Sequence, residues 1–172
     1  MTIKVGDKLP AGTLKEFIEV ETEGCSLGPN NVDVVAATVG KTIAIFALPG
    51  AFTPTCSAKH LPGYVARFDA LRAAGVDEIW CLSVNDAFVM GAWAREQKTS
   101  GKIRMLGDGS AAFTQAVGLP LDLTTNGMGV RSQRYSMLVV DGSVETLNIE
   151  AAGKFEVSDA DTMLAQAKAA KP

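Results

Sequence analysis

Cys56 ends the stretch LPGAFTPTC, residues 48–56, in which an apolar run, a Pro-Gly turn and a Thr-Pro-Thr segment lead to a single thiol. Pro54 suits the first position of a helix, because the amide proton that proline lacks would have no partner there. Thr53 would then be the N-cap and Cys56 the third helical residue. Free backbone N–H groups and the positive end of the helix dipole favour a thiolate at that place. The pattern therefore predicts a nucleophilic sulfur, and the alternative is a small buried hydrophobic residue.

The other thiols and the single histidine limit which chemistry is available. The chain has three cysteines, Cys25, Cys56 and Cys81, and one histidine, His60. It has no CxxC pair, and one histidine is too few for an ordinary Cys/His zinc site. We therefore expect reduced thiols in a reducing compartment, with no metal and no cofactor.

Length and composition are those of an ordinary globular protein. The chain has 172 residues, which favours a single domain over residues 1–172. Apolar residues make up 47% and charged residues 20%, with a net charge of −3 and no block of like charges. This balance does not indicate nucleic-acid or membrane partners. The longest strictly apolar run, residues 43–48, is too short to span a membrane. The start MTIKVGDKLP lacks the apolar segment of a signal peptide, so we expect a cytoplasmic protein.

The thiol must be positioned by an alternation of strands and helices. Apolar runs predict buried strands at 42–48 and 78–84, a short strand at 103–106, and a hairpin of strands 135–140 and 146–150 around Asp141-Gly142. Helices are expected after Cys56 (interrupted near Pro62 and closed by Gly75), after Asn85-Asp86, at 111–117, and from a Ser158/Asp161 capping box to about residue 169. Phe88 and Trp93 fall on an apolar helix face and are expected in the core. Residues 24–31 are expected to be a loop. The order predicts an α/β fold with a mixed central sheet flanked by helices.

The stretch around Cys56 resembles the active-site signature of peroxiredoxins. Pro49, Thr53 and Cys56 match P-x-x-x-T-x-x-C, and PGAFTPTCSAKHLPGY, residues 49–64, is similar to the type II subgroup, which includes the atypical mammalian form. The likeness continues in SVNDAFVMGAW at 83–93 and RSQRYSMLVVDG at 131–142. The three segments occur in the right order, and the likeness as a whole covers most of the chain.

The resemblance implies a thioredoxin-like fold and a thiol-dependent peroxidase that reduces hydrogen peroxide and alkyl hydroperoxides. Cys56 would be the peroxidatic cysteine, which attacks the O–O bond and becomes a sulfenic acid. The family also places an arginine beside the sulfur. Arg131 and Arg134 are both candidates, and we choose Arg134 because it directly precedes Tyr135 at the start of a strand. Its guanidinium would bind the peroxide oxygens and stabilise the transition state.

The remaining residues near the thiol receive smaller roles. Pro49 would shield the sulfur from water, and Thr53 would contact the peroxide, although a helix cap is its other reading. His60 follows Cys56 by four residues and invites a Cys–His dyad. The resemblance assigns sulfur activation to the arginine and the helix terminus, so we expect His60 to be structural or to tune the pocket.

The sequence departs from those relatives that carry a second cysteine near the C-terminus. After Cys81 the chain has no thiol, which excludes a C-terminal resolving cysteine. Cys81 lies in the apolar run EIWCLSV and is expected to be an inert core thiol. Cys25, in the predicted loop, is either incidental or a resolving cysteine. We therefore expect a one-cysteine cycle in which an external thiol, glutathione with glutaredoxin or else thioredoxin, reduces the sulfenic acid. The resemblance also suggests a homodimer.

Two other functions compete with the peroxidase. A thiol–disulfide oxidoreductase would share the fold, but the missing CxxC argues against it. A non-catalytic binding or redox-sensing module would not need Pro49, Thr53, Cys56 and Arg134 together. Fold alone does not decide between them.

Overall fold

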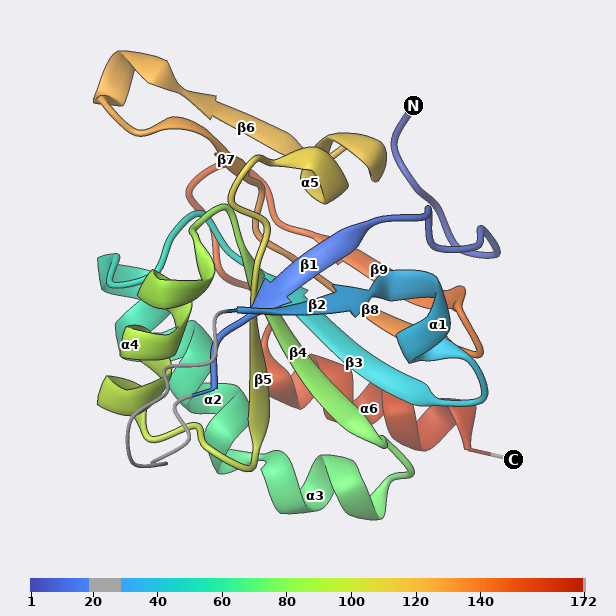
Figure 1. The fold of residues 1–172 in the computed structure, drawn as a ribbon. Helices are drawn as coiled ribbons and strands as arrows, with labels where there is room; N and C mark the ends of the chain where they lie inside the picture. Colours follow the sequence, from blue (N-terminus) through green and yellow to red (C-terminus); the bar gives the residue numbers. More distant parts are fainter. Residues whose placement is uncertain (19–28, 172) are drawn as a thin grey trace.

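The computed structural model describes residues 1–18 and 29–171, and its centre is a seven-stranded mixed sheet (Figure 1). The sheet has the order β2-β1-β5-β4-β3-β8-β9. Strands β3, β4 and β5 are parallel to one another, and the other pairings are antiparallel. The bounds are β1 Thr13–Glu16, β2 Asn30–Asp33, β3 Thr42–Ala47, β4 Glu78–Ser83, β5 Ile103–Gly107, β8 Tyr135–Val140 and β9 Ser143–Ile149.

Helices cover both faces of this sheet. Their bounds are α1 Val34–Thr38, α2 Leu61–Ala66, α3 Phe68–Ala73, α4 Ala87–Gln97, α5 Ala112–Ala116 and α6 Ala160–Ala170. A π-helix, Cys56–His60, precedes α2. A small hairpin, β6 Pro120–Leu123 and β7 Gly129–Ser132, joined through a 3-10 turn at Thr124–Asn126, projects from one end of the sheet (Figure 1). The α/β prediction with a mixed sheet is confirmed.

The alternation of side chains along β3 explains the two layers. Ala44, Phe46 and Leu48 point into a cluster with the π-helix, α2, α3, α4 and α6. Ile43, Ile45 and Ala47 point the other way, into a cluster with the N-terminal segment, α1 and α5. All six side chains are fully buried, as expected for a central strand covered on both faces. Cys56 belongs to the first cluster. The helices of that cluster therefore hold the thiol in its place.

Most predicted elements are confirmed, with shifted ends. The helical segment after Cys56 is interrupted as expected, with Pro62 in the first turn of α2 and a second break at Arg67 between α2 and α3. Asp141 and Gly142 form the hairpin turn with positive φ angles of 46° and 71°. Helix α5 ends before Gly118, whose φ is 73°. Strand β9 begins at Ser143, earlier than predicted, because Ser143 pairs with Val140 directly across the two-residue turn; the pairing with β8 contains a bulge at Leu138/Val139.

Three expectations are wrong, and several short elements were not predicted. Asp159, not Ser158, caps α6 by accepting the N–H of Thr162 at 3.1 Å. Phe88 is not a core residue but is 57% exposed, whereas Trp93 is fully buried as predicted. Asn30 and Asn31, placed in a loop, belong to strand β2. Strands β1, β6 and β7 and helix α1 were not predicted, because each has only four or five residues and too few apolar positions to show a period.

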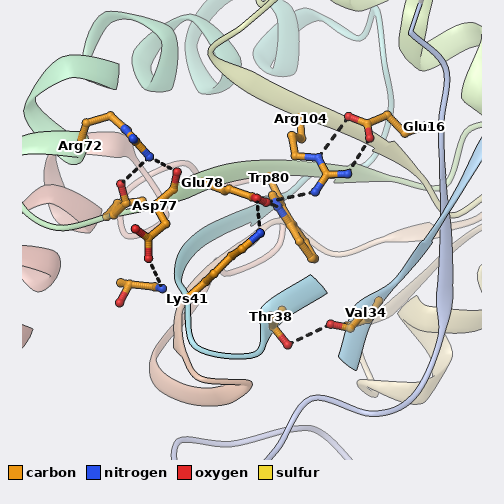
Figure 2. A network of polar contacts seen from close by, with 11 residues as sticks. Glu16, Val34, Thr38, Lys41, Arg72, Asp77, Glu78, Trp80 and Arg104 are labelled. Carbon is orange, nitrogen blue, oxygen red and sulfur yellow. Dashed lines mark hydrogen bonds and ion pairs between the residues drawn. The ribbon is translucent and has the colours of Figure 1, made fainter. Parts of the chain in front are cut away.

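A polar network links three strands of the sheet with the residue that precedes β3 (Figure 2). Glu78 accepts hydrogen bonds from Lys41 (2.8 Å), Trp80 (2.7 Å) and Arg104 (3.1 Å). Arg104 also pairs with Glu16 at 2.7 Å. Burial alone would raise the pKa of Glu78, but these three donors outweigh it and lower that pKa. The network links β1, β4 and β5 to the residue preceding β3 and so stabilises this part of the sheet.

Candidate active site

Cys56 lies at the beginning of a helix and is fully buried. The helical backbone starts at Pro54, as the sequence predicts. The N–H of Ser57 donates to the carbonyl of Thr53 at 3.0 Å, so the N–H groups before Ser57 belong to the unpaired first turn. The backbone then widens into a π-helix, in which the N–H of Leu61 bonds to the carbonyl of Cys56. Such π-turns are rare and occur mostly at functional sites.

The loop between β3 and this helix is held by side chains from the neighbouring strand end. Asn85 accepts the N–H of Ala51 at 2.9 Å and the hydroxyl of Ser83 at 2.6 Å. Phe52 has a φ of 65°, which is strained for a bulky residue. On the helix side, the indole of Trp93 donates to the hydroxyl of Ser57 at 3.1 Å. The loop is therefore fixed on both sides of the thiol.

Thr53 precedes the helix, but its side chain does not act as the cap that its position suggested. Its hydroxyl donates to the carbonyl of Gly50 at 2.7 Å. This bond consumes the hydroxyl proton and leaves the oxygen lone pairs as acceptors. Gly50 has little room for a side chain, because a Cβ there would lie 3.1 Å from Thr53 and 3.2 Å from Arg131.

Arg134 directly precedes β8, and its side chain reaches the sulfur of Cys56. Its Nη2 lies 3.3 Å from Sγ of Cys56, and its Nη1 lies 2.8 Å from Nδ1 of His60. The other candidate, Arg131, donates to the carbonyls of Met128 (2.9 Å) and Val84 (3.3 Å). The structure therefore brings Arg134 to the thiol and gives Arg131 a structural position beside Gly50.

His60 is fully buried and uses both ring nitrogens away from the thiol. Nδ1 faces Arg134, and Nε2 lies 3.1 Å from the carbonyl of Ser158. Burial, and then the positive charge of Arg134, lower the pKa of His60 from 6.5 to about 3. An imidazole of such low basicity with both nitrogens engaged is a poor general base, which argues against a Cys–His dyad.

The lowered pKa of His60 predicts that the protein loses stability in mild acid. The unfolded chain binds a proton on His60 below about pH 6.5, whereas the folded chain does not until about pH 3. The unfolded state therefore binds more protons in this window, and stability present above pH 6.5 is lost as the pH falls. Between pH 7.5 and 5.0 the free energy of unfolding should decrease by about 2 kcal/mol.

Urea unfolding at pH 7.5 and 5.0 measures this decrease directly. The His60→Asn variant has no titrating ring, so its free energy of unfolding should change much less over the same interval. Equal pH dependence in the two proteins would contradict the assignment to His60.

A cavity of about 190 Å³ lies against Arg134, next to the buried thiol. Its walls combine small and apolar residues with polar and charged ones; the lining residues include Pro49, Leu121, Ala151 and Ala152 on the one hand and Gln133, Arg134, Glu150 and Lys154 on the other. A larger hollow of about 920 Å³ lies at the polar network, beside Glu78 and Arg104. Neither lining includes a cysteine or a histidine among the described residues. The smaller cavity is the one next to the thiol, because Arg134 lines it and also contacts Sγ of Cys56.

The other two cysteines, Cys81 and Cys25, differ in what the structure says of them. Cys81 is fully buried in β4, and burial, followed by the nearby sulfur of Cys56, raises the pKa of its thiol well above the usual value. Such a thiol is a poor nucleophile, as the sequence suggested. Cys25 lies outside the described residues, so its proposed resolving role is not addressed by the structure. Residues 1–18 and 29–171 contain no group of three or more His, Cys, Asp or Glu side chains that could hold a metal ion.

Of the four residues selected from the sequence, the structure places Arg134 against Cys56 and Pro49 on the same cavity as Arg134, while the hydroxyl of Thr53 bonds to Gly50. The sequence did not predict two contacts that hold Arg134 and His60 in place. The ring of Phe155 lies 5.8 Å from the guanidinium carbon, and the acceptor for His60 is a backbone carbonyl. A carbonyl has no sequence signal, and Phe155 stands in a loop without periodicity.

The thiol of Cys56 is buried at the start of a helix, and Arg134, directly before β8 of the mixed sheet, contacts it. This arrangement is typical of the class of enzymes whose cysteine sulfur reacts directly with the substrate. Comparison with known proteins narrows this class. The profile of the redoxin family matches residues 4–164. Peroxiredoxin-2B from Arabidopsis thaliana is 44% identical over 94% of this chain and 96% of its own length.

Solved structures agree with this relationship. A crystal structure of reduced Prx3 in complex with H2O2 from Vibrio vulnificus is 48% identical, with a TM-score of 0.88 over 96% of this chain and 99% of that one. A Burkholderia cenocepacia protein, described provisionally as a thioredoxin reductase, is 61% identical, with a TM-score of 0.92 over 96% of this chain and 98% of that one.

The chain belongs to the redoxin family, and within it to the peroxiredoxins of type II. Its fold is thioredoxin-like, and it is a thiol-dependent peroxidase. The resemblance seen in the sequence is thereby confirmed, and the reading as a non-catalytic module is not supported. Among the described residues, no helix is long and apolar enough to cross a membrane.

Proposed function

We propose that Cys56 is the peroxidatic cysteine of this enzyme and that Arg134, Thr53 and Pro49 complete its site. The observation that carries the proposal is the 3.3 Å contact between Nη2 of Arg134 and Sγ of Cys56. In the reaction, a sulfur lone pair attacks one peroxide oxygen and the O–O bond breaks. The leaving oxygen takes the bonding electrons and a proton and departs as water or an alcohol, while Cys56 becomes a sulfenic acid.

Each partner of the sulfur has a distinct task. The guanidinium of Arg134 donates to the peroxide oxygens and gains strength as negative charge moves to the leaving oxygen. Thr53, whose proton is engaged by the carbonyl of Gly50, accepts a hydrogen bond from the hydroxyl of the bound peroxide. Pro49 lines the cavity beside Arg134 and has no N–H to bind water there. The polar part of that lining suits hydrogen peroxide, and its apolar part suits the alkyl group of small alkyl hydroperoxides.

Regeneration is proposed to follow a one-cysteine cycle with an external thiol. A first thiol attacks the sulfenic acid, releases water and forms a mixed disulfide with Cys56. A second thiol then restores Cys56 and leaves with the first as a disulfide. The missing C-terminal cysteine supports this route, and glutathione with glutaredoxin, or else thioredoxin, would supply the thiols.

Peptide mapping after one equivalent of hydrogen peroxide tests the site and the cycle together. We expect a sulfenic acid at Cys56, trapped with dimedone, and peroxide turnover that requires an added thiol system. Running the assay with glutathione and glutaredoxin in parallel with thioredoxin identifies the reductant. A disulfide between Cys25 and Cys56, formed without added thiol, would refute the one-cysteine cycle.

We also propose a cytoplasmic homodimer in which residues 1–172 act as one domain. Phe52, in the active-site loop, is 51% exposed and Phe88, on α4, is 57% exposed; exposed aromatic side chains are typical of protein interfaces. Sedimentation velocity at micromolar concentration should give twice the 18.0 kDa mass of one chain. A monomer mass would contradict the dimer, and recovery of the protein in a membrane or organelle fraction would contradict the location.

A further inference from the structure

The hydrogen bonds of His60 define its protonation state. Arginine has only donors, so Nδ1 of His60 must accept the hydrogen bond from Arg134. The carbonyl of Ser158 has only lone pairs, so Nε2 must carry the proton. His60 is therefore the neutral Nε2–H tautomer, held between a backbone carbonyl and the guanidinium.

The residue whose carbonyl selects this tautomer, Ser158, is itself anchored through Glu150 to the backbone of Arg134. One carboxylate oxygen of Glu150 accepts the N–H groups of Glu156 (2.7 Å), Val157 (2.7 Å) and Ser158 (2.8 Å) and the hydroxyl of Ser158 (2.9 Å). The N–H of Glu150 donates to the carbonyl of Arg134 at 3.0 Å. The contacts thus run from Arg134 through His60, Ser158 and Glu150 back to the backbone of Arg134. A shift of His60 would therefore disturb the position of Arg134.

The neutrality of this anchor matters for the reaction. In the described part of the chain, no ion pair involves Arg134. A carboxylate in the place of His60 would hold the guanidinium equally well but would neutralise its charge. An imidazole acceptor orients Nη1 and leaves the full positive charge for the sulfur and the developing oxyanion.

We propose that His60 is a positioning residue, a neutral acceptor that aims Arg134 at Cys56 and preserves its charge. The inference rests on the proposed role of Arg134 at the site. It assigns His60 no contact with the peroxide and no proton transfer.

Two substitutions separate the two nitrogens of His60. Asparagine can place its amide oxygen near the position of Nδ1, and so keep the acceptor for Arg134. Glutamine can place its amide nitrogen near Nε2, and so keep the bond to Ser158 while losing that acceptor. His60→Gln should slow oxidation of Cys56 by hydrogen peroxide about 100-fold, because a displaced catalytic group is costly. His60→Asn should lose at most about tenfold, the worth of the missing bond to Ser158.

Tyr64→Phe is the matched control, since the hydroxyl of Tyr64 donates to the same carbonyl of Ser158 at 2.9 Å. It should leave the oxidation rate within about twofold. Alkylation of Cys56 by iodoacetamide provides a second readout, because that reaction does not need the guanidinium to bind a leaving oxygen. His60→Gln should therefore lower the ratio of the peroxide rate to the alkylation rate, whereas a general loosening of the fold would not.

A double variant distinguishes failure of this inference from failure of the proposed site. If His60 acts through Arg134, His60→Gln adds no further loss to Arg134→Ala. A full additional loss, or equal rates in His60→Gln and His60→Asn, overturns the inference while leaving the site intact. An Arg134→Ala variant that oxidises normally would instead overturn the proposed site.

The wild-type protein offers a test that needs no variant. Because the chain contains one histidine, nitrogen NMR of protein labelled with ¹⁵N-histidine reports His60 without ambiguity. The Nε2–H tautomer should persist between pH 8 and 5. A protonated ring or the Nδ1–H tautomer at neutral pH would refute the proposed contact with Arg134.

Discussion

Replacing Cys56 by serine is expected to abolish peroxide reduction and to leave the fold unchanged. The hydroxyl of serine is neither ionised nor strongly nucleophilic at neutral pH, so hydrogen peroxide should be consumed no faster than in buffer. In the wild-type protein the indole of Trp93 bonds to Ser57, the residue after Cys56. Stopped-flow tryptophan fluorescence should therefore change as Cys56 is oxidised, and this change should be absent in Cys56→Ser.

Cys81→Ala is the matched control for this experiment. The thiol of Cys81 is buried with a raised pKa, so its loss should keep the oxidation rate within a few-fold. The small cavity left in the core should cost about 1 kcal/mol of stability. Peroxide consumption that persisted in Cys56→Ser and vanished in Cys81→Ala would reverse the assignment of the reactive thiol.

Arg134→Ala is expected to have the second largest effect, a fall of about 10² to 10³ in the rate of Cys56 oxidation. This is the range observed when one preorganised donor to a developing oxyanion is removed. The loss arises in the transition state, because the guanidinium binds the leaving oxygen more strongly as its charge grows. Stopped-flow measurement over a series of peroxide concentrations gives the second-order rate constant directly.

Two further variants, Arg134→Lys and Arg131→Ala, test whether the loss of rate is specific to the guanidinium of Arg134. Lysine keeps the charge but cannot bridge His60 and the sulfur with two nitrogens of one planar group, so it should recover only part of the lost rate. Arg131 bonds to the carbonyls of Met128 and Val84 and not to the sulfur. Its removal should mainly lower stability, with less than tenfold loss of rate. A larger loss in Arg131→Ala than in Arg134→Ala would contradict the choice between the two arginines.

Local sequence patterns determined the parts of the fold that depend on neighbouring residues. The apolar runs predicted β3, β4 and β8, and Asp141-Gly142 predicted the hairpin turn, because burial and turn geometry are imposed within a few residues. Pro54 likewise marked the helix start beneath Cys56. The short elements β1, β6 and α1 escaped prediction, because contacts with distant segments rather than a local period stabilise them: β1 and β6 pair with other strands, and α1 buries Val34 in the core.

The candidate site divides in the same way. Thr53 and Cys56 could be selected from the sequence because they lie on one turn of chain, whereas Arg134 was chosen over Arg131 by its resemblance to a family pattern and not by spacing. Only the tertiary structure brought Arg134, 78 residues away, to the sulfur. It also showed that His60 faces this arginine and not the thiol, and that a backbone carbonyl, Ser158, sets its tautomer. These contacts join distant segments through the packing of β8 and the loop before α6, and no local pattern encodes which side chain will meet a carbonyl from 98 residues along the chain.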